Sequence, residues 1–397
     1  MRFHNLFCFF LALAVEARNC VCRNNKDVFY NEFVKSADVD PTVEITQKNE
    51  TLKDVHDKID SSTTIGKKIT VLNSCSFDIS VGITGSDNGI SLDESCPKYQ
   101  KNNGNGRCFW SLDTPDVLTS GEEWSTDISA ENDHLFSGTI WGAKTLLMKD
   151  SCPSGRCEPW VGPTGAVTKA EFTLSRENTD YTDISIIEGA NLPITMYAND
   201  ADVDPEDRYD CGVAGSGSWE FTPDKNLEKF VTIVRSDTEE TCETNSDCSE
   251  NLVCGASFKT SPPNYGVCGS FSGIASAHLN CIAGSTGPPF FCQNEKEALS
   301  CQGEYSLSGY NSPIGSKVCG CPDWEEFGID APPVAKCTTS DKHWEEKSLP
   351  FLIFLKKACP LCYSYAYDDM SSTVTCDRSK SYTVEFCPNE TEKEFFF

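Results

Sequence analysis

Two carboxylates in one predicted hairpin have a spacing that suits acid–base chemistry. Ala170–Leu174 and Tyr181–Ile187 alternate apolar and polar residues and are separated by a turn-like segment. Antiparallel pairing around that turn sets Glu171 opposite Asp183. The alternate positions face the core: Phe172, Ile184 and Ile186. Opposed side chains have Cβ atoms about 5 Å apart, so the two carboxyl groups should share a proton and one pKa should be raised. A general acid beside a general base needs this arrangement, and a register slip of a residue or two would destroy it.

Other groups of reactive residues are less suited to chemistry. Cys359-Pro-Leu-Cys362 has the spacing of a redox centre but follows a predicted helix instead of preceding one, so we expect two disulfide half-cystines. The histidines are scattered, and we expect no metal and no cofactor. Asp200–Asp207 resembles the opening of a calcium loop, yet Pro205 and Cys211 stand where an EF-hand needs Gly and Glu, which leaves open only an irregular calcium site.

Composition excludes several classes of partner. The chain has 397 residues, with 33 Lys and Arg against 60 Asp and Glu, a formal charge of -27. Nucleic acid and anionic membranes are bound mainly through Lys and Arg, so neither is an expected partner. The 23 cysteines lie among Gly, Pro, Ser and Asn, which is typical of a chain folded in an oxidising compartment.

The N-terminus predicts export. Residues 1–17 combine a basic start, the apolar run Leu6–Val15 and small residues at a cleavage site, as in a signal peptide. A membrane span needs about 20 apolar residues, so this run is too short. Cleavage removes Cys8, one of the 23 cysteines, and leaves 22, an even number that allows full pairing. We expect a secreted, monomeric protein without a membrane span.

The remaining chain divides by pattern. Residues 18–66 are polar and mixed in charge, as in a flexible extension, and Cys20 and Cys22 within it are expected to pair with downstream cysteines. From residue 67 onward, short alternating runs predict strands at 68–73, 76–83, 121–128, 170–174, 181–187 and 381–386. Such strands favour a mainly β, antiparallel β-sandwich.

The sandwich is expected to comprise about 67–144, 168–211 and 360–388, with a small disulfide loop at 145–167. Cysteines crowd into 212–359, which predicts a disulfide-rich, loop-rich second lobe with a helix at Leu349–Ala358. Residues 389–397 form a tail. Asn49 and Asn389 begin glycosylation sequons.

Several motifs in one order resemble the thaumatin family, the thaumatin-like or pathogenesis-related group 5 proteins. They are Ile69–Ser86, Ser120–Trp124, Gly138–Gly142, Ala170–Leu174 with Asp183–Asn191, and Phe354–Pro388. The resemblance spans roughly 67–388 and is patchy between 212 and 340. It implies a thaumatin-like β-sandwich, a disulfide-rich lobe beside it and an acidic cleft.

The resemblance also implies disulfides. It pairs Cys75 with Cys387, Cys211 with Cys376 and Cys152 with Cys157, and it places Cys359 on a family cysteine whose upstream partner is ambiguous here. Cys96 and Cys108 flank an insertion and are expected to form a disulfide that closes it.

In the family an Arg, a Glu and three Asp line the cleft. The matching residues here are Glu171, Asp183, Glu188, and Asp368 or Asp369. The Arg normally follows Trp-Gly, and Lys144 stands one residue late. Glycoside hydrolysis needs two carboxyl groups and no cofactor, so Glu171 would be the acid and Asp183 or Glu188 would activate water.

The resemblance therefore implies a secreted protein with a defence or antifungal role that binds β-1,3-glucan or a related cell-wall polysaccharide, either alone or with weak endo-β-1,3-glucanase activity. A solvated carboxylate face without a carbohydrate role is one alternative. Another is a non-enzymatic extracellular protein-binding module, an inhibitor or ligand that uses the 212–340 lobe, where the departures from family spacing concentrate.

Overall fold

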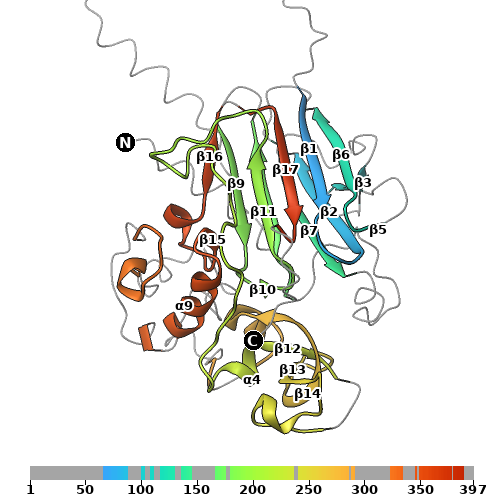
Figure 1. Cartoon of the computed structure of the whole chain (residues 1–397), viewed down its shortest axis with the longest axis vertical. Helices are drawn as coiled ribbons and strands as arrows, with labels where there is room; N and C mark the ends of the chain where they lie inside the picture. The colour runs from blue at the N-terminus through green and yellow to red at the C-terminus, as the bar shows by residue number, and fades with distance from the viewer. Residues whose placement is uncertain are drawn as a thin grey trace, which may run out of the picture. The chain divides into compact units, whose positions relative to one another are not determined.

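A computed structural model describes the domain that follows the N-terminal extension (Figure 1). The described residues are 66–87, 100–102, 108–110, 117–129, 136–144, 166–175, 179–236, 240–285, 288–290, 322–333, 345–346, 348–377 and 379–388. Several predictions lie outside them: the signal peptide 1–17, almost all of the extension with Cys20, Cys22 and Asn49, the Cys96–Cys108 and Cys152–Cys157 pairs, Asn389, and the tail 389–397.

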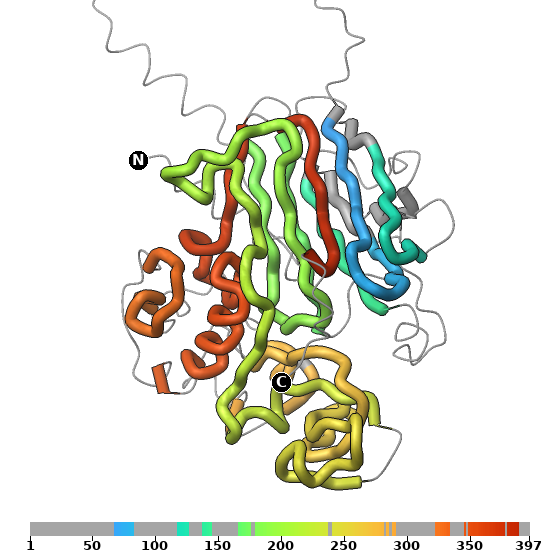
Figure 2. The backbone as a smooth tube through the Cα atoms, viewed as in Figure 1, coloured from blue at the N-terminus to red at the C-terminus, as the bar shows by residue number. Residues whose placement is uncertain are grey.

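One sheet of the sandwich joins the first and last described strands. It has the order β11-β17-β1-β6. The bounds are β1 (Gly66–Asn73), β6 (Glu123–Ser129), β11 (Ile194–Ala198) and β17 (Ser381–Phe386). β1 and β17 run parallel, with Ile69 beside Tyr382, and Figure 2 shows them side by side in blue and red. The Cys75–Cys387 disulfide, which the resemblance implied, joins the same two ends across a sequence separation of 312.

The second sheet carries the candidate site. Its main path is β15-β9-β8-β7-β2-β4-β3, with β16 beside β9 and β5 beside β2. The bounds are β2 (Ile79–Asp87), β3 (Gln100–Asn102), β4 (Cys108–Trp110), β5 (Val117–Leu118), β7 (Phe136–Lys144), β8 (Lys169–Leu174), β9 (Asp180–Ser185), β15 (Cys362–Tyr363) and β16 (Val374–Cys376). The predicted strands at 170–174 and 181–187 are β8 and β9.

The main core lies between these two sheets, as a sandwich requires. Alternate residues of each sheet are fully buried and belong to one cluster: Ile69, Val71, Ile140, Phe172, Ile184, Ile194 and Val384. The sheets approach closely where Gly142 of β7 faces Phe386 of β17, because a Cβ on Gly142 would lie 2.6 Å from the phenyl ring. The predicted mainly β sandwich is confirmed. Most pairings in the two sandwich sheets are antiparallel, but β15 pairs with β9, and β17 with β1, in parallel.

The lobe contains more strand than the sequence predicted. Its sheet has the order β10-β14-β12-β13, and β13 also pairs with β14. The bounds are β10 (Gly189–Ala190), β12 (Thr232–Arg235), β13 (Val253–Ser257) and β14 (Asn264–Ala275), and short helices accompany them: α4 (Glu228–Val231), η2 (Asn245–Asp247) and α5 (Ala277–Ile282). The register shifts at Ile233/Val234 and at Gly255/Ala256. These irregularities break the two-residue period by which strands are recognised in a sequence.

Disulfides hold this lobe as expected. Cys242–Cys254 and Cys248–Cys268 form a small cluster of their own with Leu252. The sulfur atoms of Cys242, Cys248 and Cys268 lie within 4.8 Å of one another, but each is already part of a disulfide.

The segment after the lobe covers the outer edge of β9. The helix predicted at Leu349–Ala358 is α9, with the same bounds, and Pro350 in its first turn suits the N-terminus. α9 and the short η4 (Trp324–Phe327) share a second core, which contains Trp324, Leu352 and Tyr365. η5 (Asp369–Ser371) follows, and Cys211–Cys376, also implied by the resemblance, ties β16 to the end of the 200–210 loop. Among the described helices, none has the length and apolarity needed to cross a membrane.

Candidate functional site

The carboxylate pair lies where the hairpin pattern predicted. β8 and β9 pair antiparallel with Glu171 opposite Asp183, and Thr139 of β7 lies opposite Glu171 on the other side. Ala170 and Phe172, the neighbours of Glu171, are fully buried in the core. Because side chains alternate along a strand, Glu171 and Asp183 share the other face of the sheet. We call this face, with Glu188 and Asp369 described below, the acidic face.

The acidic face is covered on the side of β9. Asp183 is only 2% exposed. Its Oδ1 is buried and has no hydrogen-bond partner within the described part of the chain. Glu171 is half-buried, and the Thr139 hydroxyl donates to its Oε1 at 3.5 Å. A ligand could therefore reach Glu171 more readily than Asp183.

Burial and mutual repulsion raise the pKa values of these groups. Burial is the main cause that raises the pKa of Asp183 well above its usual value, and the charges of Glu171 and Asp369 raise it further. Burial likewise raises the pKa of Glu171; the charge of Lys169 opposes this rise and that of Glu188 adds to it. The shared proton predicted from the sequence therefore has a physical basis in both desolvation and like charge.

A tyrosine from β15 helps to place the next carboxylate. Cys362 and Tyr363 pair in parallel with Ile184 and Ser185 of β9. The Tyr363 hydroxyl donates to Oδ1 of Asp369. Burial raises the pKa of Asp369, while this hydrogen bond opposes the rise. Nothing in the sequence marked Tyr363, because only the folded chain brings β15 to the edge of β9.

Asp368 does not have the role of a cleft-lining carboxylate that the sequence predicted for it or Asp369. It is fully buried, and its oxygens accept hydrogen bonds from Lys356 (2.8 Å), the Trp324 indole (3.1 Å) and the hydroxyl groups of Ser364 and Ser371. A carboxylate with both oxygens so occupied offers nothing to a ligand. Of the two adjacent aspartates, Asp369 is the one beside Asp183.

The cation of the site is Lys169, not Lys144. Lys144 shares the strand parity of the core residue Ile140, and its ammonium lies 4.6 Å from the centre of the Phe77 ring. Lys169 precedes Glu171 by two residues and so lies on the acidic face. Its Nζ donates to Oε2 of Glu188 at 2.6 Å, and both side chains are mostly buried. Strand alternation could have identified Lys169 from the sequence.

Glu188 is placed by the lobe. It precedes β10, whose two residues pair with Ala275 and Ile274 of β14. Gly189 has a positive φ of 119° and packs against the Ile274 carbonyl, so another residue type there would clash. The acidic face thus combines carboxylates from the sandwich with one that the first strand of the lobe sheet positions.

Three tryptophans, Trp141, Trp219 and Trp324, are too buried to stack on sugar rings. Trp141 lies on the acidic face, opposite Lys169, but is only 5% exposed and rests over Gly82. Trp219 and Trp324 are also buried. Hydrogen bonds from hydroxyl groups to the carboxylates are therefore the chemistry that this face offers to a ligand.

Comparison with known proteins identifies the family. The thaumatin family model matches residues 73–307 and 335–388. Thaumatin-like protein 1 of Pyrus pyrifolia is 26% identical over 288 residues, which cover 70% of this chain and 80% of that protein. Pathogenesis-related thaumatin-like protein 3.5 of Cryptomeria japonica is 25% identical over 264 residues, 64% of this chain and 71% of the relative.

One solved structure with a weak likeness is a laminaripentaose-producing β-1,3-glucanase in complex with laminaritetraose, with 11% identity and a TM-score of 0.33 over 81% of this chain and 98% of that one. A likeness of this size bears on neither the fold nor the function. The family model, by contrast, extends over most of the domain, from Asn73 at the end of β1 to Pro388 after β17, with a gap between residues 307 and 335. The chain belongs to the thaumatin family.

Proposed function

We propose that this protein is secreted and binds a neutral cell-wall polysaccharide of the β-1,3-glucan type on its acidic face, with weak endo-hydrolysis as an accompanying activity. The observation that carries the proposal is the directly opposed pair Glu171 and Asp183, which belong to the same face as the Lys169–Glu188 ion pair. Carboxylates accept hydrogen bonds from sugar hydroxyl groups, and the charge of -27 would repel an acidic polymer.

The environments of the carboxyl groups favour different roles. Glu171 is half-buried and has a raised pKa, as a general acid requires. Glu188 is held by the ammonium of Lys169 and is suited to activating water as a carboxylate. Asp183 is too buried to contact substrate easily, and because its pKa is raised well above the ordinary value it takes the proton of the pair before Glu171 does, so we assign it no direct contact with the substrate. Two carboxyl groups in separate environments are the minimum that glycoside hydrolysis needs.

Purified protein incubated with a laminarin-type glucan tests the proposal. We expect retention on insoluble glucan and slow release of reducing ends. Glu171→Gln should abolish release and keep most of the binding, because the amide keeps the shape but cannot deliver the proton. Glu123→Gln is the matched control, since Glu123 is an exposed residue of the other sheet.

Two results would contradict parts of this proposal. Absence of both retention and reducing ends refutes glucan as the ligand and favours the alternative in which the lobe binds a protein. Full hydrolysis by Glu171→Gln refutes only the catalytic assignment.

A further inference from the structure

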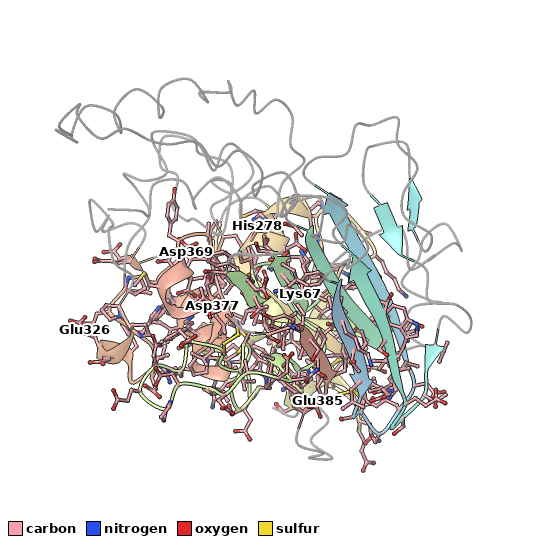
Figure 3. The ribbon with its side chains drawn as sticks, turned by 90° about the horizontal axis from the view of Figure 1, so that it is seen from above. Lys67, His278, Glu326, Asp369, Asp377 and Glu385 are labelled. Atoms are coloured by element: carbon pink, nitrogen blue, oxygen red, sulfur yellow. A yellow bond between two sulfur atoms is a disulfide. The ribbon has the colours of Figure 1, made fainter. Side chains whose placement is uncertain are left out.

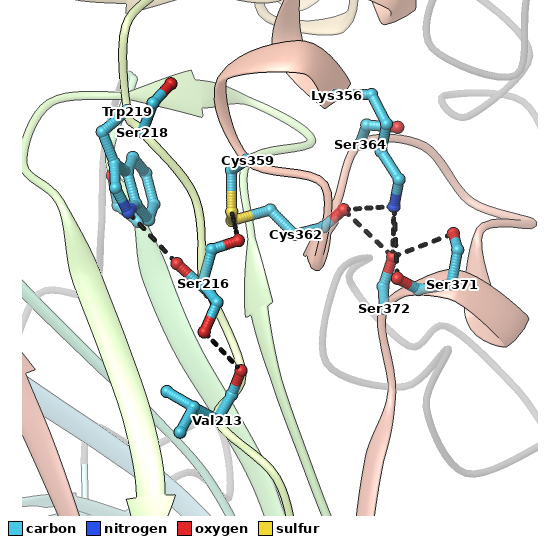
Figure 4. Close-up of a disulfide and its surroundings, with 12 residues drawn as sticks. Val213, Ser216, Ser218, Trp219, Lys356, Cys359, Cys362, Ser364, Ser371 and Ser372 are labelled. Carbon is cyan, nitrogen blue, oxygen red and sulfur yellow. Dashed lines mark hydrogen bonds between the residues drawn. A yellow bond between two sulfur atoms is a disulfide. The ribbon is translucent and has the colours of Figure 1, made fainter. Parts of the chain in front are cut away.

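A lysine lies fully buried behind the acidic face. Lys356 is 0% exposed on α9, and its Nζ is 2.8 Å from each of three oxygens: Oδ2 of Asp368, Oγ of Ser372 and the carbonyl of Cys362. Figure 4 shows the ammonium beside Ser372 and the Cys362 carbonyl. The carbonyl of Ser371 lies at 3.4 Å. An ammonium has three protons to donate, so the hydrogen-bonding capacity of Lys356 is fully used inside the protein.

The partners of Lys356 bracket a short loop. Cys362 immediately precedes Tyr363, while Ser371 and Ser372 come just after Asp369 in the chain. One ammonium therefore ties both ends of the loop 362–372, and the loop carries the Tyr363–Asp369 hydrogen bond. We call this loop, with the Lys356 ammonium, the tied loop.

Stability alone does not account for a buried ion pair here. The carboxylate of Asp368 is also 0% exposed, and removing two charges from water costs several kcal/mol per ion, which well-packed apolar residues would avoid. The neighbouring contacts are specific: the Trp324 indole and the Ser364 backbone N–H both donate to Asp368. Such a network defines one conformation of the loop better than apolar packing would.

We propose that Lys356 is a positioning residue for the acidic face, because it fixes the tied loop and thereby holds Asp369 beside Asp183. That this placement serves ligand binding rests on the proposed function, so the experiments below use no glucan. The loop is attached to the site by backbone as well, since the Tyr363 carbonyl accepts from the Ile186 N–H at 2.9 Å.

The charge of Lys356 is sensitive to alkaline pH. Burial lowers its pKa to about 8, Asp368 opposes this, and the charge of Arg208 lowers it further. The Trp324 ring also faces the ammonium at 5.5 Å. Deprotonation leaves too few donors for all the oxygens around Nζ, so the tied loop should loosen as the pH rises through this value.

Paired substitutions separate positioning from simple charge balance. Lys356→Met leaves Asp368 buried without its cation, whereas Lys356→Met with Asp368→Asn removes both charges and keeps their shapes. Lys357→Met is the matched control, because Lys357 is its exposed neighbour on α9. Amide hydrogen exchange by mass spectrometry measures the exchange rates of the loop amides. NMR titration of the carboxyl carbons measures the pKa values of Asp183 and Asp369.

If Lys356 positions the loop, both the single and the double variant should exchange the 362–372 amides at least tenfold faster, with β17 unchanged as the reference. The pKa of Asp183 should also fall toward its ordinary value as Asp369 moves away. Lys357→Met should match the wild type. A double variant with wild-type exchange and titration overturns the proposal, since Lys356 would then only neutralise Asp368.

The wild-type protein provides a test that needs no variant to fold. From pH 7 to 9.5, exchange in 362–372, corrected for the intrinsic rate, should accelerate relative to β17. An unchanged ratio of protection between the two segments over this pH range overturns the proposal.

Discussion

Asp183 and Asp180 lie three residues apart on β9, and replacing each by Asn should change stability in opposite directions. Both are buried, at 2% and 0% exposure. Oδ1 of Asp183 has no hydrogen-bond partner among the described residues and faces other carboxylates. Asp180 accepts hydrogen bonds from Lys67 (labelled in Figure 3), from the Tyr382 hydroxyl and, at 2.7 Å, from the Ser175 N–H.

The direction of the stability change caused by Asp183→Asn follows from proton linkage. The pKa of Asp183 is about 3.9 in the unfolded chain and higher in the folded protein. Between these two pH values the native state therefore binds more protons than the unfolded state. The contribution of Asp183 to stability is complete below about pH 3.9 and is lost as the pH rises through the folded pKa, at about 1.4 kcal/mol per pH unit. Asp183→Asn cannot titrate, so at pH 7 it should be more stable than the wild type by at least about 1 kcal/mol, or by a few degrees in Tm.

Asp180→Asn should have the reverse effect. It leaves the ammonium of Lys67, whose side chain is only 10% exposed, without a counter-charge. Removing one partner of a buried ion pair costs about 3–5 kcal/mol. Thermal unfolding of both variants from pH 4 to 8, with disulfides intact, tests the pair. Burial also raises the pKa of Asp180, although Lys67 and its other donors oppose the rise, so the pH test for Asp183 is the comparison with the wild type. The reasoning about Asp183 is refuted if its Asn variant is less stable than the wild type at pH 7, or if the stability difference between that variant and the wild type does not change with pH.

Two further substitutions test the geometry of the site. Lys169→Met removes the charge that lowers the pKa of Glu171, so that pKa should rise in an NMR titration; Lys144→Met, on the other face of the sheet, should leave it unchanged. Gly82→Ala would drive a Cβ into the Trp141 indole and should destabilise the fold by about 1–3 kcal/mol in chemical denaturation, whereas an unchanged midpoint would show that the indole does not rest on Gly82.

The hairpin was predictable because its two faces have different chemistry. Phe172 and Ile184 must be buried, and a one-residue slip would expose them, so the register that places Glu171 opposite Asp183 follows from the residue pattern. The same rule places Lys144 on the core side, with Ile140. The prediction for Lys144 followed its position after Trp-Gly and overlooked this alternation.

Other features depend on contacts that no local pattern encodes. Asp368 and Asp369 are adjacent and chemically identical, and only the position of Lys356 decides which of them is enclosed. β14 contains Gly266 and Gly273 with positive φ, and its alternation is interrupted, so its sequence resembles a loop. The upstream partner that the resemblance implied for Cys359 was wrong, because Cys359 pairs with Cys362. The spacing of these two cysteines permits a local disulfide but does not require one.

The distribution of lysines supports the assignment of the site. Asp180 has Lys67 and Asp368 has Lys356, each with hydroxyl donors in addition. Asp183, on the same strand as Asp180, has a pKa that burial raises well above its usual value and that the charges of Glu171 and Asp369 raise further. An uncompensated buried carboxyl lowers stability, and such groups concentrate at functional sites. Asp183, which has no cation beside it among the described residues, is therefore more informative about function than the charge of -27 on the whole chain.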